Sequence, residues 1–374
     1  MIVDVAVIGA GAAGSAAAAV LAPEASVALI DRVAVPGWRI GETLPGAARR
    51  VLAAIGAWER FVAAGHAEAP LKVSRWGSDT AVELDSFRDP DGVGWRLDRA
   101  RFEADLRANA EARGATLIAP AAVRSLARTA RGWTVALTTG ASLEARQIID
   151  ASGRRSRLLQ PFGQRRVVAD RLACAYQRVR QRGDVDPSTY IEAVPEGWWY
   201  TAALPDGWRI VAFHGDSDQP ALRSILRARP LAAGQRIPGL AAAIGDVDPT
   251  DAPAPALCVA NSAAASAAGR GWLAAGDSTI ALDPLSSQGL LNALVTGLEA
   301  GEAALALLGG DPVAVPRHAE RMARIWRAYL GHYAIYYAME RRWPTSPFWR
   351  RRIAPGSDDG VDDGGASRFD TASR

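Results

Sequence analysis

The N-terminal part of the chain alternates short apolar runs with a helix-like repeat. Residues 2–8, IVDVAVI, alternate and then run apolar, which is typical of a strand that is buried on both faces. An alanine-rich repeat at residues 15–22 follows and predicts a helix. Further apolar runs at residues 26–30 and 146–150 predict more strands. A strand, a helix and a second strand in close succession indicate an α/β fold.

Three glycines lie where the first strand meets the first helix. Gly9, Gly11 and Gly14 have the spacing GxGxxG, in which the glycines make a tight turn, admit a pyrophosphate and let helix and strand pack. The helix N-terminus supplies N–H groups to the phosphates. Asp31 ends the next strand, at the spacing of an acid that accepts from a ribose hydroxyl. The motif predicts a dinucleotide site but does not separate NAD from FAD.

The middle and the end of the chain have different patterns. Residues 188–213 alternate aromatic and β-branched positions around a Pro-Asp-Gly turn, which indicates antiparallel strands. Together with residues 76–97 they predict a sheet that covers the cofactor, with the substrate between the layers. Residues 317–343 are amphipathic and aromatic, and predict helix packed on the core.

These patterns divide the chain into four parts. We expect a cofactor-binding unit, a substrate-covering β-sheet unit, a C-terminal helical segment and a polar, disordered tail. Their ranges are 1–75, 98–160 and 260–310 for the first, 76–97 and 161–259 for the second, 311–353 for the third and 354–374 for the fourth.

Composition narrows the class of protein. The 374 residues are 49% hydrophobic, enough for a large core, and carry a formal net charge of +3. Cys174 and Cys258 cannot build a disulfide framework, and neither they nor the four histidines have metal-ligand spacing. The N-terminus lacks the pattern of a signal peptide, and we expect no run that spans a membrane. We therefore expect a cytoplasmic protein with no metal site, no nucleic-acid partner and no membrane association.

Glycines and two polar residues later in the chain extend the first motif and carry a resemblance to a known family. They are Gly153, Gly276, Asp277, Gly289 and Asn292. With the first glycine motif, they resemble the FAD-binding fingerprints of the large flavoprotein monooxygenase and halogenase superfamily. The resemblance implies FAD bound to a Rossmann-like domain of the GR2 type.

The same resemblance implies roles for these residues. Asp277 would hold the ribityl chain of FAD, and the turn and helix at Gly289 and Asn292 would approach the flavin ring. Arg99, in the segment LDRARFEADL, matches an arginine that contacts the FAD phosphates. The alternative for Arg99 is an exposed charge at the start of a helix.

The segment GWRIGETLPGAARRVL narrows the resemblance to one branch. This branch is halogenase-like and includes the flavoprotein maturases that build cysteine tryptophylquinone in quinone-cofactor oxidases. Members carry a segment like Gly41-Glu42 beside the flavin ring; the alternative is a polar loop. The substrate ring would be a tryptophan in a partner protein or peptide, or a free indole, phenol or pyrrole.

Lysine is nearly absent from this arginine-rich chain. Of 43 lysine and arginine residues, Lys72 is the only lysine. Tryptophan halogenases place a lysine between flavin and substrate at nearly the spacing that separates Glu42 from Lys72. A compact ammonium can donate to a peroxide or hypohalite oxygen where a bulky guanidinium cannot. The alternative for Lys72 is one surface lysine at a strand edge.

Three departures from the halogenase pattern affect the predicted reaction. The signature WxWxIP falls on WWYTAA, so Trp198 is kept, Tyr200 replaces the second tryptophan and Ile-Pro is lost. Ser286 stands where tryptophan halogenases carry a glutamate that assists proton removal from indole. Ser152 stands where single-component hydroxylases carry an acid tied to reduction by NAD(P)H, which favours reduced flavin supplied by a separate reductase.

We therefore predict an FAD-dependent monooxygenase that uses O2 and a flavin C4a-hydroperoxide to oxygenate an electron-rich aromatic ring. Lys72 is the candidate donor, Ser286 and Ser287 are candidate polar groups, and Trp198 and Tyr200 are candidate pocket walls, although strand aromatics are often plain core. Alternatives are a flavin-dependent halogenase, a reductase of the prenyl-reductase type and a flavin-bound chaperone.

Overall fold

The first strand of the chain lies at the centre of a parallel sheet. The computed structural model describes residues 1–85, 90–183 and 186–353, so the expected disordered tail lies outside the described residues. Strand β1 pairs in parallel with β11 on one side and with β2 on the other. The sheet order is β20-β21-β11-β1-β2-β8, and β10 and β9 follow β11 as antiparallel strands. The bounds are β1 (Ile2–Ile8), β2 (Val27–Ile30), β8 (Thr116–Ile118), β9 (Val123–Thr129), β10 (Gly132–Leu137), β11 (Ser142–Asp150), β20 (Ala268–Gly269) and β21 (Trp272–Ala274).

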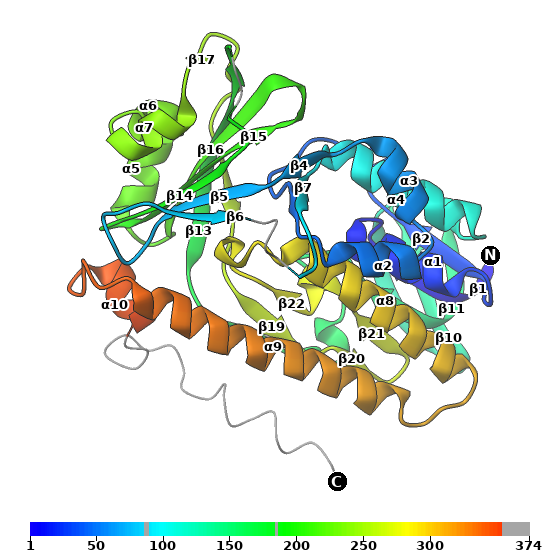
Figure 1. Ribbon diagram of the computed structural model, residues 1–374. Coiled ribbons are helices and arrows are strands. Elements are labelled where there is room, and N and C mark those ends of the chain that lie inside the picture. The colour runs from blue at the N-terminus through cyan, green and yellow to red at the C-terminus, as the bar shows by residue number, and fades with distance from the viewer. Residues whose placement is uncertain (86–89, 184–185, 354–374) are drawn as a thin grey trace.

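Helices cover one face of this sheet. Side chains of β1 and β2 share one core with α1 (Ala12–Leu21), α2 (Ala48–Ala54), α3 (Trp58–Ala64), α4 (Arg99–Ala112) and α8 (Gly289–Leu308) (Figure 1). Helices α1 and α8 approach closely, and glycine at position 297 permits this. A Cβ there would lie 2.2 Å from the Ala13 carbonyl oxygen. The predicted Rossmann-like α/β unit is confirmed.

Helix α8 corrects one expectation. It has 20 residues and a mean hydropathy of 1.3, so by length and composition it could cross a membrane. In this structure it packs against α1 and against α9 (Ala314–Met339). The prediction that no run reaches membrane-spanning length was therefore wrong for this segment, because the same apolar residues serve a protein core.

A second sheet forms the other large layer. Its order is β17-β13-β16-β15-β14-β5-β6, with β18 paired to β13. All its pairs are antiparallel except β14 with β5, as the alternating pattern predicted. The bounds are β5 (Leu71–Arg75), β6 (Val82–Asp85), β13 (Leu172–Gln181), β14 (Thr189–Val194), β15 (Gly197–Leu204), β16 (Trp208–Asp216), β17 (Val247–Asp248) and β18 (Ala256–Val259).

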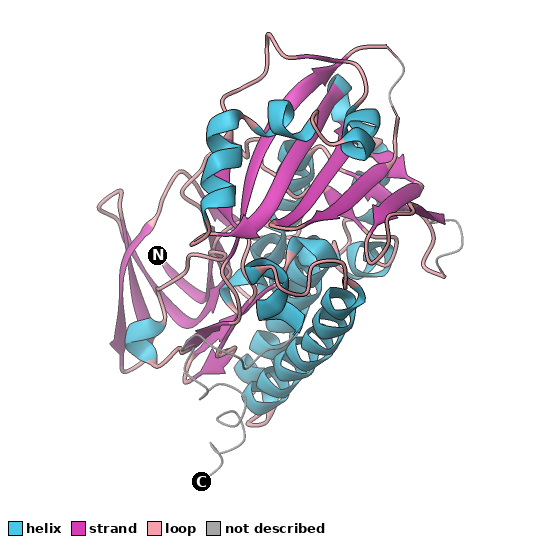
Figure 2. Cartoon of the chain, turned by 90° about the vertical axis from the view of Figure 1, so that its left-hand side faces the viewer, coloured by secondary structure: helices cyan, strands magenta, loops and turns pink. Residues whose placement is uncertain are grey.

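The membership of β5 differs from the expected division of the chain. The sequence analysis assigned residues 1–75 to the cofactor-binding unit, but β5 pairs with β14 and β6 in the second sheet. The outer face of that sheet packs against α5 (Pro220–Ala228), α6 (Pro230–Gly234) and α7 (Pro238–Ile244). Figure 2 shows the sheet in the upper half of the molecule, with the long helices below it.

Two small sheets and the C-terminal helices connect the layers. One sheet contains β3 (Thr43–Leu44), β4 (Ala67–Ala69) and β7 (Gly94–Arg96), and the other contains β12 (Arg166–Val168), β19 (Ala263–Ala265) and β22 (Ile280–Ala281). Helix α9 runs from the α8 side to the second sheet and is followed by α10 (Pro347–Ile353) (Figure 1).

Helix α10 is anchored by charge and by aromatic packing. Arg352 is buried and donates to Asp216 of β16 at 2.7 Å. Trp349 and Tyr337 pack with Trp76 and Trp198 in one cluster on the inner face of the second sheet, the face turned toward the cofactor-binding unit. The C-terminal helices are thus part of the folded core.

Candidate active site

The turn between β1 and α1 has the backbone geometry that a dinucleotide phosphate needs. Gly9 has a φ of +102°, and a Cβ at Gly14 would lie 1.7 Å from the Gly9 carbonyl oxygen, so both positions require glycine. At Gly11 the space is open, because a Cβ would meet only an Arg39 nitrogen at 4.0 Å. Gly11 directly precedes α1, whose first N–H groups have no partner within the helix. A phosphate can therefore approach this turn and accept from those groups.

Asp31 is fixed beside the same turn. Its Oδ2 accepts from the Ala10 N–H at 2.7 Å and lies 3.1 Å from an Arg107 nitrogen. Its Oδ1 accepts from the Val33 N–H at 2.8 Å. The carboxylate is thus oriented where the sequence predicts a ribose, and contact with a ribose hydroxyl stays a prediction.

Two further glycines end strands at the same edge of the first sheet. Gly153 follows β11 and Gly276 follows β21, with φ values of +91° and +63°. No atom lies within 4 Å of a Cβ built at Gly153, so this backbone is also open to a ligand. The Asp277 carboxylate lies 3.2 Å from Nε of Arg154. Asp277 is therefore held at this edge by a charged partner, and its contact with the ribityl chain stays a prediction.

Glu42 is a buried carboxyl group with an unsatisfied oxygen. Its exposed fraction is 1%, Oε2 accepts from the Gly41 N–H at 2.9 Å, and Oε1 has no hydrogen-bond partner among the described residues. Burial raises the pKa of Glu42, and Arg99 opposes the change. A buried oxygen without a partner is costly unless a ligand satisfies it. The position is therefore a buried one and not an ordinary polar loop.

Arg99 is buried as well, so its alternative as an exposed charge is wrong. Its guanidinium donates to the carbonyl oxygens of Gly41 and Ile40 and to Glu103. Its Nε has no partner among the described residues. Arg99 thus positions the Gly41-Glu42 segment, and its contact with the FAD phosphates stays a prediction.

The structure places Lys72 on the inner face of the second sheet. Its neighbours Val73 and Arg75 face the outer helices, since Val73 joins that core and Arg75 pairs with Glu192 at 3.3 Å. Because side chains alternate along a strand, Lys72 points to the opposite face. Tyr200 lies on that inner face as well.

Arg96 joins the Lys72 region to the Gly41-Glu42 segment. Its guanidinium donates to Thr189, a residue of β14 that pairs directly with Lys72 of β5. It also donates to Tyr200 Oη at 2.9 Å and to Oγ1 of Thr43, which follows Glu42 in the chain. The predicted residues Lys72, Tyr200 and Glu42 are therefore brought to one region by an arginine that the sequence analysis did not select.

A cavity of about 480 Å³ lies between α8 and α9. This volume is in the range of pockets that hold small organic ligands. Its wall is mostly apolar and aromatic, with a few polar groups: Leu282, Asp283, Leu285, Ser286, Gln288, Leu291, Asn292, Val295, Ile325, Tyr329, His332, Tyr333, Tyr336 and Tyr337.

Asp283 is the carboxyl group of this cavity. It is 2% exposed, and its Oδ2 accepts from Tyr337 Oη at 2.7 Å. Burial, reinforced by repulsion from Asp170, raises the pKa of Asp283 to about 7. A carboxyl group that titrates near neutrality can take up or release a proton at working pH.

The predicted polar residues near α8 have different positions. Ser286 lines the cavity and donates to the Asp283 carbonyl oxygen at 2.7 Å. Ser287 has a left-handed φ of +53° and is not among the lining residues. Asn292 lines the cavity, but its amide donates to the Ile280 carbonyl oxygen. Gly289 begins α8 with open space at its Cβ position, so a ring can approach there.

Trp198 differs from its expected position as a pocket wall. It is 1% exposed, stacks on His214 with ring centroids 3.7 Å apart, and donates from Nε1 to Tyr337 Oη at 3.3 Å. Burial lowers the pKa of His214 to about 3, so this stack is neutral. Trp198 does not line the cavity between α8 and α9, because its ring and its N–H are already occupied in the core.

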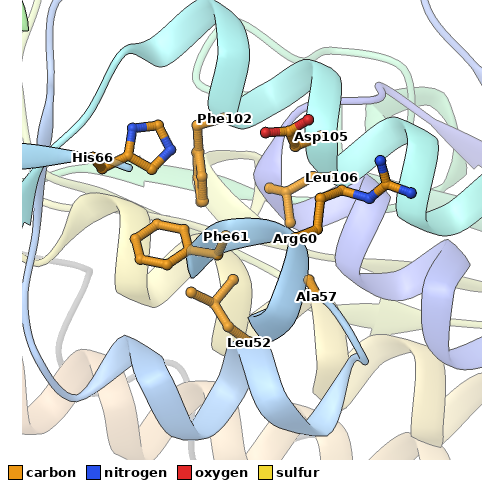
Figure 3. Close-up of a pocket in the computed structure, with 8 residues that line it drawn as sticks. All are labelled: Leu52, Ala57, Arg60, Phe61, His66, Phe102, Asp105 and Leu106. Atoms are coloured by element: carbon orange, nitrogen blue, oxygen red, sulfur yellow. The ribbon is translucent and has the colours of Figure 1, made fainter. Parts of the chain in front are cut away.

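A second, much smaller cavity lies among α2, α3 and α4. Figure 3 shows His66 beside Phe61 and Phe102, with Arg60 and Asp105 at one side. Its volume of about 10 Å³ holds no more than one water molecule, so it is no ligand site. Within residues 1–85, 90–183 and 186–353, no group of three or more His, Cys, Asp or Glu side chains could hold a metal ion.

Comparison with known proteins assigns the family. The profile of the tryptophan halogenase family matches residues 72–359, more than three quarters of the chain. This chain belongs to the tryptophan halogenase family. It is 28% identical over 363 residues to LodB of Marinomonas mediterranea, which is named as an FAD-dependent oxidoreductase; the match covers 94% of this chain and 97% of LodB.

Two solved structures have the fold of this halogenase-family chain. The myxobacterial chondrochloren halogenase CndH has a TM-score of 0.85 at 23% identity, and the match covers 96% of this chain and 87% of that one. QhpG, a peptidyl tryptophan dihydroxylase essential for tryptophylquinone cofactor biogenesis, has a TM-score of 0.78 at 22% identity, with 96% and 81% covered.

The halogenase-family chain is an FAD-dependent oxidoreductase, and its site fits the cofactor. Open glycine backbones at Gly11, Gly153 and Gly289 leave room beside the turns. Glu42 Oε1 and Arg99 Nε are buried without a hydrogen-bond partner among the described residues, as expected of groups that a bound polar ligand satisfies. Asp283 was missed by the sequence analysis because nothing in the sequence alone shows that an Asp-Pro pair will be buried in a cavity.

Proposed function

We propose that this chain is an FAD-dependent monooxygenase that oxygenates an electron-rich aromatic ring, in the first place a tryptophan side chain within a partner protein or peptide. Reduced FAD is supplied by a separate flavin reductase. The observation that carries the proposal is the aromatic cavity between α8 and α9, which has a titratable carboxyl group in its wall.

The cavity suits a ring that belongs to a larger molecule. Tyr336 and His332 line it and are exposed, so its mouth opens to solvent. Tyr333 and Tyr336, which keep part of their surface exposed, supply ring surfaces for stacking. An indole can enter while the rest of a polypeptide stays outside. The named activity of QhpG on a peptidyl tryptophan supports this choice of substrate.

The residues of this chain would divide the work as follows. The turns at Gly11, Gly153 and Gly276 hold FAD, which when bound and reduced supplies an activated oxygen atom from O2. Lys72, on the inner face of the second sheet, holds a proton for the departing oxygen. Asp283 accepts the proton that the ring must lose, with its charge stabilised by the Tyr337 hydroxyl. The second sheet covers the site and excludes water.

Halogenation is the second candidate, because the matching family is named for it and CndH, which has the same fold, is a halogenase. Both reactions need Lys72 and the same cofactor. Ser286 stands where a halogenase glutamate is expected, and Trp198 is locked in the core. We therefore rank oxygenation first, and the dependence of the product on halide separates the two.

The test uses FAD-loaded protein with a flavin reductase, NADH and air. The probes are N-acetyltryptophanamide and a tryptophan-containing peptide, each with and without sodium bromide. We expect a product heavier by one or two oxygen atoms, the same with and without bromide. A product that carries bromine would replace monooxygenase by halogenase. Substrate reduction without O2 would instead indicate a reductase.

Variants connect the product to the site. Lys72→Gln removes the ammonium and should lower the rate of product formation at least about a hundredfold, the usual range for a lost proton donor. The matched control is Arg75→Gln, which changes a cation on the same strand but on the opposite face. Equal rates of product formation in Lys72→Gln and Arg75→Gln would show that Lys72 is not the proton donor.

A further inference from the structure

The only two cysteines of the chain lie directly opposite each other. Cys174 is on β13 and Cys258 is on β18, and the register of the two antiparallel strands pairs them. In a chain of 374 residues, nothing in the sequence spacing of 174 and 258 predicts this meeting. The strand pairing alone creates a thiol pair.

The pair has the backbone spacing of a disulfide. The Ala260 N–H donates to the Leu172 carbonyl oxygen at 3.0 Å, which makes these opposed residues a hydrogen-bonded pair. Two residues further along, Cys174 and Cys258 form a pair of the same kind, with Cα atoms about 5.5 Å apart. Disulfides need Cα atoms between about 4.4 and 6.8 Å apart, so this spacing lies in the disulfide range; the side chains must also turn toward each other, because opposed Cβ atoms of a hydrogen-bonded pair lie near the upper limit that a disulfide spans.

Both thiols point to the inner face of the second sheet. Cys174 packs in the aromatic cluster of that face, and Cys258 packs against it. Leu257 and Val259, on either side of Cys258, are 50% and 44% exposed and point outward. Cys258 is therefore the inward residue of a short edge strand. It is partly exposed, whereas Cys174 is buried.

Charge distinguishes the two thiols further. A hydrogen bond with Cys174 and, next, the positive charges of Arg154 and Arg155 lower the pKa of Cys258, against burial and Glu42. Burial raises the pKa of Cys174. The accessible thiol is thus the better nucleophile, and the buried thiol is placed to resolve it. Arg154 also pairs with Asp277, so the arginine whose charge acts on Cys258 is held by a residue of the predicted cofactor site.

We propose that Cys174 and Cys258 form a reversible disulfide and that hydrogen peroxide is the oxidant. The Cys258 thiolate attacks one peroxide oxygen, the O–O bond breaks and hydroxide leaves, which gives a sulfenic acid. The Cys174 thiol attacks that sulfur, closes the S–S bond and releases the oxygen as water. Two thiols lose two electrons, one peroxide is reduced to two waters, and a dithiol reductant reverses the change.

The thiol pair has a local source of oxidant. Activated oxygen that is not transferred to a ring leaves a flavin site as hydrogen peroxide. This source rests on the proposed function, but the reaction of the thiols with added peroxide does not. The two parts can therefore be tested separately.

The first test uses FAD-loaded protein that has been reduced with dithiothreitol and desalted without air. One equivalent of hydrogen peroxide is added, the protein is denatured in N-ethylmaleimide, and its intact mass is measured. We expect two maleimides before peroxide, none after it, and two again after dithiothreitol. A peptide digest should contain a 174–258 cross-link.

Single variants identify the order of events. In Cys174→Ser, dimedone should trap a sulfenic acid at Cys258; in Cys258→Ser, Cys174 should remain alkylatable. Two maleimides after peroxide in the wild type, over-oxidation without a cross-link, or a cross-link only between chains would overturn the proposal.

The second test separates the thiol pair from the proposed function. The holoenzyme turns over with a flavin reductase, NADH and air, without an aromatic substrate and with or without catalase. We expect the disulfide without catalase and free thiols with it. A disulfide that forms with added peroxide but not during turnover supports the thiol pair and counts against the flavin site as the source.

Discussion

The buried carboxyl group of Asp283 makes stability depend on pH in a calculable way. Its pKa is raised from 3.8 to about 7, first by burial and then by Asp170, against the Leu285 N–H, the Tyr337 hydroxyl and Arg352. Between these two values the folded protein holds a proton that the unfolded chain has released. Stability contributed by this group is therefore fully present below about pH 4 and is lost as the pH rises through about 7.

The size of the effect follows from the shift. One pKa unit corresponds to about 1.4 kcal/mol, so between pH 5 and pH 8 the change is roughly 3 kcal/mol. Asp283→Asn removes the titrating group and with it this dependence. The unfolding free energy of the variant, relative to that of the wild type, should therefore increase by roughly 3 kcal/mol from pH 5 to pH 8.

Urea unfolding of the FAD-loaded proteins at pH 5 and pH 8, followed by tryptophan fluorescence, measures the difference. Ser286→Ala is the matched control, because it changes a neighbouring cavity residue that carries no carboxyl group. The change in unfolding free energy caused by Ser286→Ala should be the same at both pH values. If the Asp283→Asn difference also stays within 1 kcal/mol across this range, burial does not perturb the carboxyl group and its proposed role as a base near neutrality fails.

Three further predictions follow from packing and chain connectivity. Gly11→Ala should leave the thermal midpoint of the cofactor-free protein unchanged, since its Cβ meets open space in the protein. The same substitution should weaken FAD binding at least tenfold in a fluorescence titration. Gly14→Ala should instead prevent folding, because its Cβ would lie 1.7 Å from the Gly9 carbonyl oxygen. Gly297→Ala places a Cβ 2.2 Å from the Ala13 carbonyl oxygen and should lower the unfolding free energy by about 1–3 kcal/mol, and an unchanged urea midpoint would contradict the close packing of α1 on α8. The disulfide between Cys174 and Cys258 closes a loop of about 85 residues and should stabilise the oxidised protein by about 4.6 kcal/mol relative to the reduced one, compared by urea unfolding with Cys258→Ser as control.

Local patterns in the sequence predicted the cofactor-binding unit well. The apolar run of residues 2–8, the glycine spacing and Asp31 are all within one short stretch, so backbone sterics and strand order determine their arrangement. The antiparallel meander of residues 188–213 was predicted for the same reason. The strand at Lys72 was predicted only through its resemblance to a halogenase strand; its sheet and the face of Lys72 follow from the pairing of β5 with β14.

The remaining features depend on distant contacts. Burial is the main cause that raises the pKa of Asp283 to about 7, and residues distant in the sequence provide it, because α9 brings Tyr329 and Tyr337 over the Asp283 segment. Trp198 is core only because His214 and Tyr337 occupy its ring and its N–H. Neither burial nor such a partner can be read from the residues beside them in the sequence.

Helix α8 has two faces with opposite tolerance to change. Gly297 and Gly301 contact α1 so closely that a Cβ would collide with its backbone or side chains, whereas Leu291 and Val295 line the cavity. Substitutions on the first face should destabilise the fold, whereas substitutions on the second should change the shape of the cavity. If the cavity holds the substrate, as we propose, one side of a single helix determines which substrate is accepted, and the other side determines the stability of the fold.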